Sequence, residues 1–141
     1  MRRIDSPTRL LRLAMSVIER IRLDLRGITV LTEVASGPFV VTPLLAALAG
    51  ADHVNAVTRN SAHGQAEEVI DYGRSLARQF GVAERIEFSS RPAAEFAASS
   101  SLVTNLGFVR PIQSDIIEKL PGDAVIALMW EPWEFRQGDI D

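Results

Sequence analysis

The chain has no cysteine, only two histidines and no long apolar run, and each absence excludes a class of protein. Without cysteine it has no disulfide, no thiolate nucleophile and no Cys-ligated metal. The histidines, His53 and His63, have no matching carboxylate cluster, so the sequence predicts no metal site. The longest apolar run lies between Gly37 and Gly50, is interrupted by proline and is too short to cross a bilayer, so no membrane partner is expected.

Positive and negative charges nearly balance, since the net charge is −3 and the pI is near 5.4. This balance gives no reason to expect nucleic acid as a partner. The length of 141 residues and the hydrophobic content of 47% fit one domain with a single core. No secretory signal is evident, since the N-terminal segment carries charges through its apolar part. A reducing cytoplasm is the simplest expected location.

Residues 1–27 are expected to form an amphipathic helix that precedes the main domain, residues 28–141. Ser6 and Pro7 fit an N-cap and a first helical position, and apolar side chains then recur at three- and four-residue spacing through residues 8–26. Residues 1–27 carry seven arginines and three acids. Such a basic helix can lie on a membrane or dock on a partner. We favour a solvated face on a helix that packs against the sheet or a second subunit.

The region that follows alternates β-branched runs with helical runs, separated by glycine, proline and serine. Strands are predicted at residues 28–34, 54–57, 85–88, 102–106 and 124–129, and helices at residues 44–49, 65–80, 92–98 and 111–120. This alternation is typical of a parallel sheet covered on both faces. We therefore predict a three-layer α/β Rossmann-like fold with strand order 3-2-1-4-5. Its ligand site is expected at the carboxyl ends of the strands.

The first predicted strand ends in residues 33–39, EVASGPF, an acidic residue followed by a turn that contains a glycine. This motif resembles the end of the first strand and the glycine-rich turn in the cofactor-binding half of the class I S-adenosylmethionine-dependent methyltransferases. Residues 49–57 and 81–88 resemble the approaches to the second and third strands. The resemblance implies a nucleotide-cofactor domain that binds S-adenosylmethionine through Glu33, Ala35, Ser36 and Gly37. It also implies methyl transfer that depends on proximity and needs no metal.

The end of the predicted fourth strand resembles, more weakly, a substrate-binding position of methyltransferases. Asn105 stands where amino-group methyltransferases place an Asn or Asp that holds the substrate nitrogen, although Leu106, Gly107 and Phe108 follow it here. An alternative is that Asn105 satisfies backbone groups in a turn.

Several residues differ from the methyltransferase pattern and suggest another cofactor. Ala35 and Phe39 replace the first and third glycines of the turn, and Ser89 follows the third strand in place of an acid. Thr58 and Arg59 replace the acid expected after the second strand. An arginine there, followed by Asn60 and Ser61, suits the 2′-phosphate of NADP. The turn lacks the GxGxxG pattern of dinucleotide-binding folds, so an NADP-dependent oxidoreductase domain is the alternative.

The C-terminal segment holds both tryptophans beside acidic residues. Glu131 and Trp133 follow the fifth strand at the predicted ligand edge, so they are candidates for substrate binding. A salt-bridged surface is the simpler interpretation of Glu131, Glu134 and Arg136. The fifth strand would form an open edge. We therefore expect either a longer protein or a homo-oligomer, and a third hypothesis is a non-catalytic module that assembles through the N-terminal helix and this tail.

Overall fold

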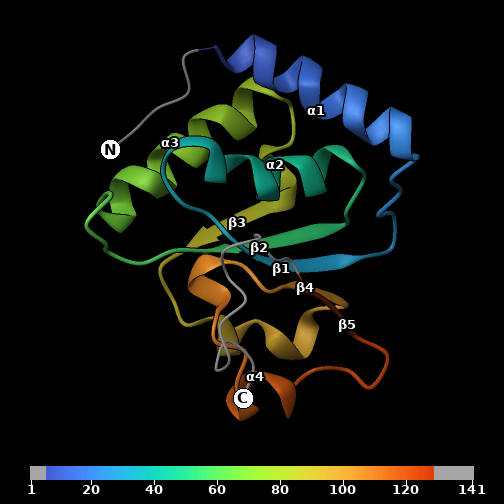
Figure 1. Cartoon of the computed structure of the whole chain (residues 1–141), viewed down its shortest axis with the longest axis vertical. Helices are drawn as coiled ribbons and strands as arrows, with labels where there is room; N and C mark the ends of the chain where they lie inside the picture. The colour runs from blue at the N-terminus through green and yellow to red at the C-terminus, as the bar shows by residue number, and fades with distance from the viewer. Residues whose placement is uncertain (1–5, 129–141) are drawn as a thin grey trace.

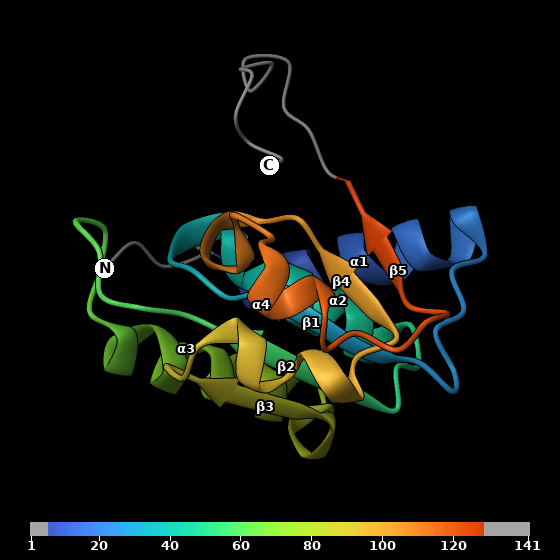
Figure 2. The same ribbon diagram turned by 90° about the horizontal axis from the view of Figure 1, so that it is seen from below.

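A five-stranded parallel sheet forms the centre of the computed structural model, which describes residues 6–128. The strand order is β3-β2-β1-β4-β5, as the sequence predicts, and the fold is Rossmann-like α/β. The strands are β1 (Thr29–Glu33), β2 (His53–Val57), β3 (Ile86–Ser89), β4 (Leu102–Thr104) and β5 (Val125–Ala127). In Figure 2, β3 and β5 lie at the two edges of the sheet.

Strand β1 is central and lies between β2 and β4. Its last residue, Glu33, pairs with Val57 at the end of β2, and Leu31 pairs with Val103 of β4. The chain continues from β2 toward one edge and from β4 toward the other. This arrangement makes the carboxyl ends of β1 and β4 a topological switch point, where open α/β sheets bind ligands.

Helices cover both faces of the sheet (Figure 1). The helices α1 (Pro7–Ile21), α2 (Val41–Leu48) and α3 (Ala66–Gln79) lie on one face, and α4 (Ser114–Ile117) lies on the other with the short 3-10 helices that precede it. Each face has its own apolar cluster, one around Leu44, Val54 and Leu76 and one around Leu31, Val103 and Ile116. The buried β-branched residues of the strands therefore pack on both sides, as expected for a parallel sheet.

Helix α1 begins as predicted but ends early. The Ser6 hydroxyl accepts a hydrogen bond from the Arg9 N–H at 3.3 Å, which caps the start of the helix. The helix ends at Ile21 because Arg22 adopts the left-handed conformation with φ of 54°. The predicted continuation to residue 26 is wrong, since the Leu25 N–H donates instead to the Ala49 carbonyl.

Helix α1 packs on α2 and forms an outer layer above it (Figure 1). Ala14 is its only buried residue, and the apolar side chains of Leu13, Val17 and Ile21 are exposed along it at four-residue spacing. The homo-oligomer expected from the sequence stays a prediction, as does the division of the chain at residue 27.

Two predicted helices are largely wrong. Residues 92–98 form the 3-10 helices η3 (Ala93–Glu95) and η4 (Ala97–Ser99), because the Ser99 and Ser100 hydroxyls donate to the Phe96 carbonyl and compete with a regular helical bond. In the predicted helix 111–120, Gln113 is extended and α4 covers only Ser114–Ile117. Proline at position 111 does not start this helix.

Within residues 6–128, the structure has no helix that is both long and apolar enough to cross a membrane. The tryptophan-rich segment begins at residue 130 and lies outside the described residues.

Candidate functional site

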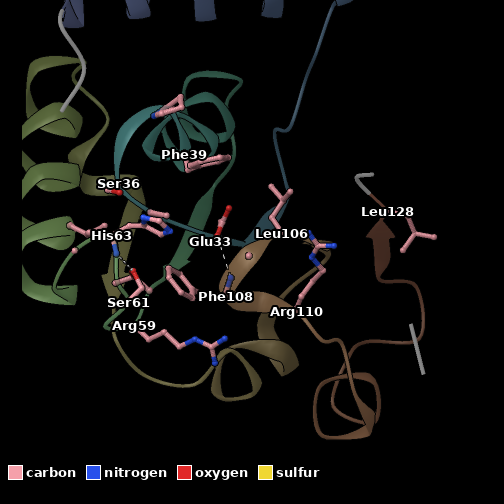
Figure 3. Close-up of a pocket in the computed structure, with 16 residues that line it drawn as sticks. Glu33, Ser36, Phe39, Arg59, Ser61, His63, Leu106, Phe108, Arg110 and Leu128 are labelled. Carbon is pink, nitrogen blue, oxygen red and sulfur yellow. Dashed lines mark hydrogen bonds between the residues drawn. The ribbon is translucent and has the colours of Figure 1, made fainter. Parts of the chain in front are cut away.

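A cavity of about 1080 Å³ opens at the carboxyl edge of the sheet. Its walls come from the end of β1, the turn that follows it, the loop after β2 and the loop after β4 (Figure 3). The cavity therefore lies at the switch point between β1 and β4, where the sequence analysis expects the ligand site. Its volume is slightly above the range for small-molecule sites, roughly 300–1,000 Å³.

The cavity brings together five of the eight predicted cofactor-binding residues. Glu33, Ala35, Ser36, Thr58 and Arg59 line it. Gly37, Asn60 and Asn105 are not among the lining residues. The predicted substrate-binding residues, Glu131 and Trp133, lie outside the described part of the chain.

Of the three predicted residues that do not line the cavity, Gly37 and Asn60 shape the loops around it. Gly37 is buried with φ of 69°, a conformation that suits glycine, and it begins the 3-10 helix η1 (Gly37–Val40). The Asn60 side-chain oxygen accepts from the Ala66 N–H at 2.9 Å at the start of α3. Asn105 is 1% exposed, and its side-chain nitrogen has no hydrogen-bond partner among residues 6–128. Its backbone N–H donates to Ala127 of β5 at 3.1 Å.

Glu33 is the acidic residue of the cavity, and it is only 5% exposed. One carboxylate oxygen, Oε2, accepts from the backbone N–H of Phe108 at 3.2 Å. A Cβ atom at residue 107 would overlap this carboxylate, so Gly107 gives it the space that it occupies. Burial raises the pKa of Glu33, while the Phe108 N–H and the charge of Arg110 partly oppose this shift.

The raised pKa of Glu33 gives a testable pH dependence. An unfolded glutamate has a pKa of about 4.3. Because burial raises the pKa of Glu33 in the folded state, that state holds the proton more tightly. The protonated side chain therefore makes its whole contribution to the free energy of unfolding at pH values below the unfolded-state pKa. This contribution is lost as pH rises through the folded-state pKa. Glu33→Gln carries no charge, so we expect its stability relative to the wild type to increase with pH.

Urea denaturation between pH 4 and pH 8 measures this difference. Glu84→Gln at an exposed position is the matched control. A wild-type protein whose stability relative to Glu33→Gln stays constant or rises with pH would contradict the proposed burial effect.

Phe108 lies between the acidic and the basic parts of the cavity. Its ring packs beneath the Arg59 guanidinium, with the guanidinium carbon 5.3 Å from the ring centroid. Its backbone N–H binds Glu33, and Figure 3 shows Phe108 between Glu33 and Arg59. The loop after β4 therefore connects the ends of β1 and β2.

Several lining residues were not predicted as site residues. Phe108 and Arg110 come from the 3-10 helix η5 (Gly107–Val109) and the residue after it. The signal in the sequence is the position of Gly107 directly after the fourth strand, at the same edge as Glu33. The loop after β2 adds Ser61, His63 and Gly64 to the lining. Ser61 was expected here as part of an NADP site.

Within residues 6–128, no metal-ligand cluster supports the cavity. Among the described residues, no three His, Asp or Glu side chains are grouped closely enough to hold a metal ion.

Comparisons with known proteins support the fold alone. No family model matches the chain, and no curated protein matches it. Among solved structures, it is similar to a chain of the Trypanosoma brucei PRMT1 enzyme-prozyme heterotetrameric complex with AdoHcy, with a TM-score of 0.51 and 16% identity. This similarity covers 82% of the present chain but only 37% of the trypanosomal chain. The Rossmann-like fold is thus shared with a protein that binds AdoHcy.

Proposed function

We propose that the cavity binds a cofactor of the S-adenosylmethionine type and that the domain is related to methyltransferases. The observation that carries this proposal is the buried Glu33 carboxylate at the end of β1, which lines a cavity at the switch point of the sheet. The PRMT1 chain with the same fold is in a complex with AdoHcy, which supports this choice of ligand.

The residues present fit the two ends of such a cofactor. Glu33 offers a carboxylate to ammonium or hydroxyl groups, and Gly107 leaves it the necessary space. Ala35 and Ser36 are small, so the ligand can approach the backbone of the first turn. Phe39 is 58% exposed and lies at the cavity wall, and Leu106 and Phe108 add apolar surface for a purine ring. The cofactor, when bound, supplies an electrophilic methyl group.

Isothermal titration calorimetry with AdoHcy and S-adenosylmethionine tests this function. Ala35→Leu places a larger side chain at the cavity wall, and we expect it to weaken binding more than about tenfold by excluding the ligand. Ala98→Leu is the matched control, because Ala98 is exposed on η4 away from the cavity. Wild-type protein that binds neither ligand, or equal affinities for both variants, would overturn the proposal.

NADP is the second candidate cofactor, and one observation favours it. Arg59 lines the cavity at the end of β2, where NADP-binding folds place a residue for the 2′-phosphate. NADP(H) can be titrated in the same calorimeter. If it binds more tightly than AdoHcy and S-adenosylmethionine, hydride transfer would replace methyl transfer as the proposed chemistry.

A further inference from the structure

The charges around the cavity are unevenly distributed. Glu33 is the acidic lining residue, and the charge of Arg110 acts on it. Arg59 lies on the other side of Phe108. Within residues 6–128, Arg59 forms no ion pair with a carboxylate. The end of β2 therefore presents a positive charge to the cavity that no acidic side chain of the described residues offsets.

The Arg59 guanidinium is also held in place. It packs over the Phe108 ring in a cation–π contact, which restricts where the guanidinium can lie. The loop that follows is fixed by hydrogen bonds, since Ser61 and Gly64 pair through their backbones and Asn60 binds Ala66. Less conformational entropy is lost when a ligand binds to a side chain whose position is already restricted.

Thr58 supplies an unused polar group beside this arginine. Thr58 lines the cavity and is 3% exposed, and its Oγ1 has no hydrogen-bond partner in the described part of the chain. A buried hydroxyl without a partner is unfavourable. Its proton can be donated to an acceptor oxygen. Thr58 and Arg59 together therefore favour a ligand group that is negatively charged and rich in acceptors.

We propose that Thr58 and Arg59 form an anion subsite at the β2 end of the cavity, which binds a phosphate or carboxylate group. Both groups match the planar donor array of a guanidinium. The subsite rests on the proposed function, in that it lies within the same ligand cavity. The anionic group belongs either to an NADP-type cofactor, as its 2′-phosphate, or to a second molecule bound beside an S-adenosylmethionine-type cofactor. A cavity of about 1080 Å³ has space for both molecules.

Calorimetric titrations of the full chain test the subsite with two probes. The first compares NADP⁺ with NAD⁺, which differ by one phosphate. The second titrates inorganic pyrophosphate into protein with and without saturating AdoHcy. We expect at least one anion to bind the wild type, and Arg59→Gln and Thr58→Val each to weaken it about tenfold. Arg78→Gln removes the same charge from an exposed site near the end of α3 and should retain wild-type affinity.

The outcomes separate the two sources of the anion. Displacement of AdoHcy by NADP⁺, with NAD⁺ much weaker, assigns the group to the cofactor. Binding of pyrophosphate to protein that keeps its AdoHcy assigns it to a second molecule. No binding of either anion overturns the subsite, and so does an equal loss in Arg59→Gln and Arg78→Gln, which would indicate non-specific attraction.

The same titrations distinguish failure of the subsite from failure of the proposed function. AdoHcy binding that Arg59→Gln leaves intact, without any anion binding, retains the function and removes the subsite. Anion binding by a protein that does not bind AdoHcy retains the subsite and removes the proposed function. Thermal melting serves as the folding control, since Arg59 is exposed and Thr58→Val keeps the shape of the side chain while removing an unpaired hydroxyl.

Discussion

Gly107→Ala is expected to lower the free energy of unfolding by about 2 kcal/mol and to weaken AdoHcy binding more than about tenfold. The added Cβ would overlap the carboxylate of Glu33, which is buried and cannot move far without losing its hydrogen bond to Phe108. The φ angle of Gly107 is 36°, which adds backbone strain for alanine. Urea denaturation and calorimetry measure the two effects.

A second variant shows whether the overlap with Glu33 is the cause. Glu33→Ala in the Gly107→Ala background removes the atoms that the new Cβ would meet, so part of the lost stability should return. The two effects should then be non-additive, as expected for residues in contact. Gly122→Ala is the control, because its Cβ would meet nothing within 4 Å. A Gly107→Ala protein as stable as the wild type would contradict the close approach.

Gly73→Ala is expected to destabilise the protein by roughly 1–3 kcal/mol, because α3 packs on β3 at this residue. A Cβ at residue 73 would lie 2.5 Å from Cε1 of Phe88, whose ring is 6% exposed. Alanine is a better helix former than glycine by about 1 kcal/mol, and this gain opposes the loss. We expect the overlap to dominate, since Phe88 lies within the apolar cluster of that face.

The Phe88→Leu background separates these two effects of Gly73→Ala. The smaller leucine leaves space for the added methyl group, so Gly73→Ala should cost less there than in the wild type. The remaining effect of Gly73→Ala then reports helix propensity. Chemical denaturation of the four proteins completes a double-mutant cycle. Equal costs of Gly73→Ala in both backgrounds would show that the Phe88 ring is not the obstacle.

The sheet could be predicted because local signals agree with the global fold. Runs such as residues 28–34 are β-branched and end in glycine or polar residues, and the helix between two such runs implies a parallel crossover. The alternation does not fix the strand order, which was expected from the Rossmann-like fold type. The predicted helices at 92–98 and 111–120 failed because they are short, so side-chain hydrogen bonds and extended residues outweighed weak helix propensity.

The candidate site could be predicted only in part. Glu33, Ala35 and Ser36 follow the first strand directly, so their place at the sheet edge comes from the position of that strand. Asn60 was predicted to contact the cofactor, but its oxygen caps the start of α3 instead. A polar residue in a loop can serve either the ligand or the backbone, and sequence alone does not distinguish the two.

The sequence by itself determined the α/β class, because hydrophobic periodicity and turn residues act over a few positions. The strand order and the edge at which the cavity lies were expected from the Rossmann-like fold type. Tertiary structure alone decided that Phe108 would bind Glu33 through its backbone and Arg59 through its ring. These residues are far apart in the chain and meet only when β1, β2 and β4 pair. The burial that raises the pKa of Glu33 has the same origin, since desolvation depends on every segment that packs around the carboxylate.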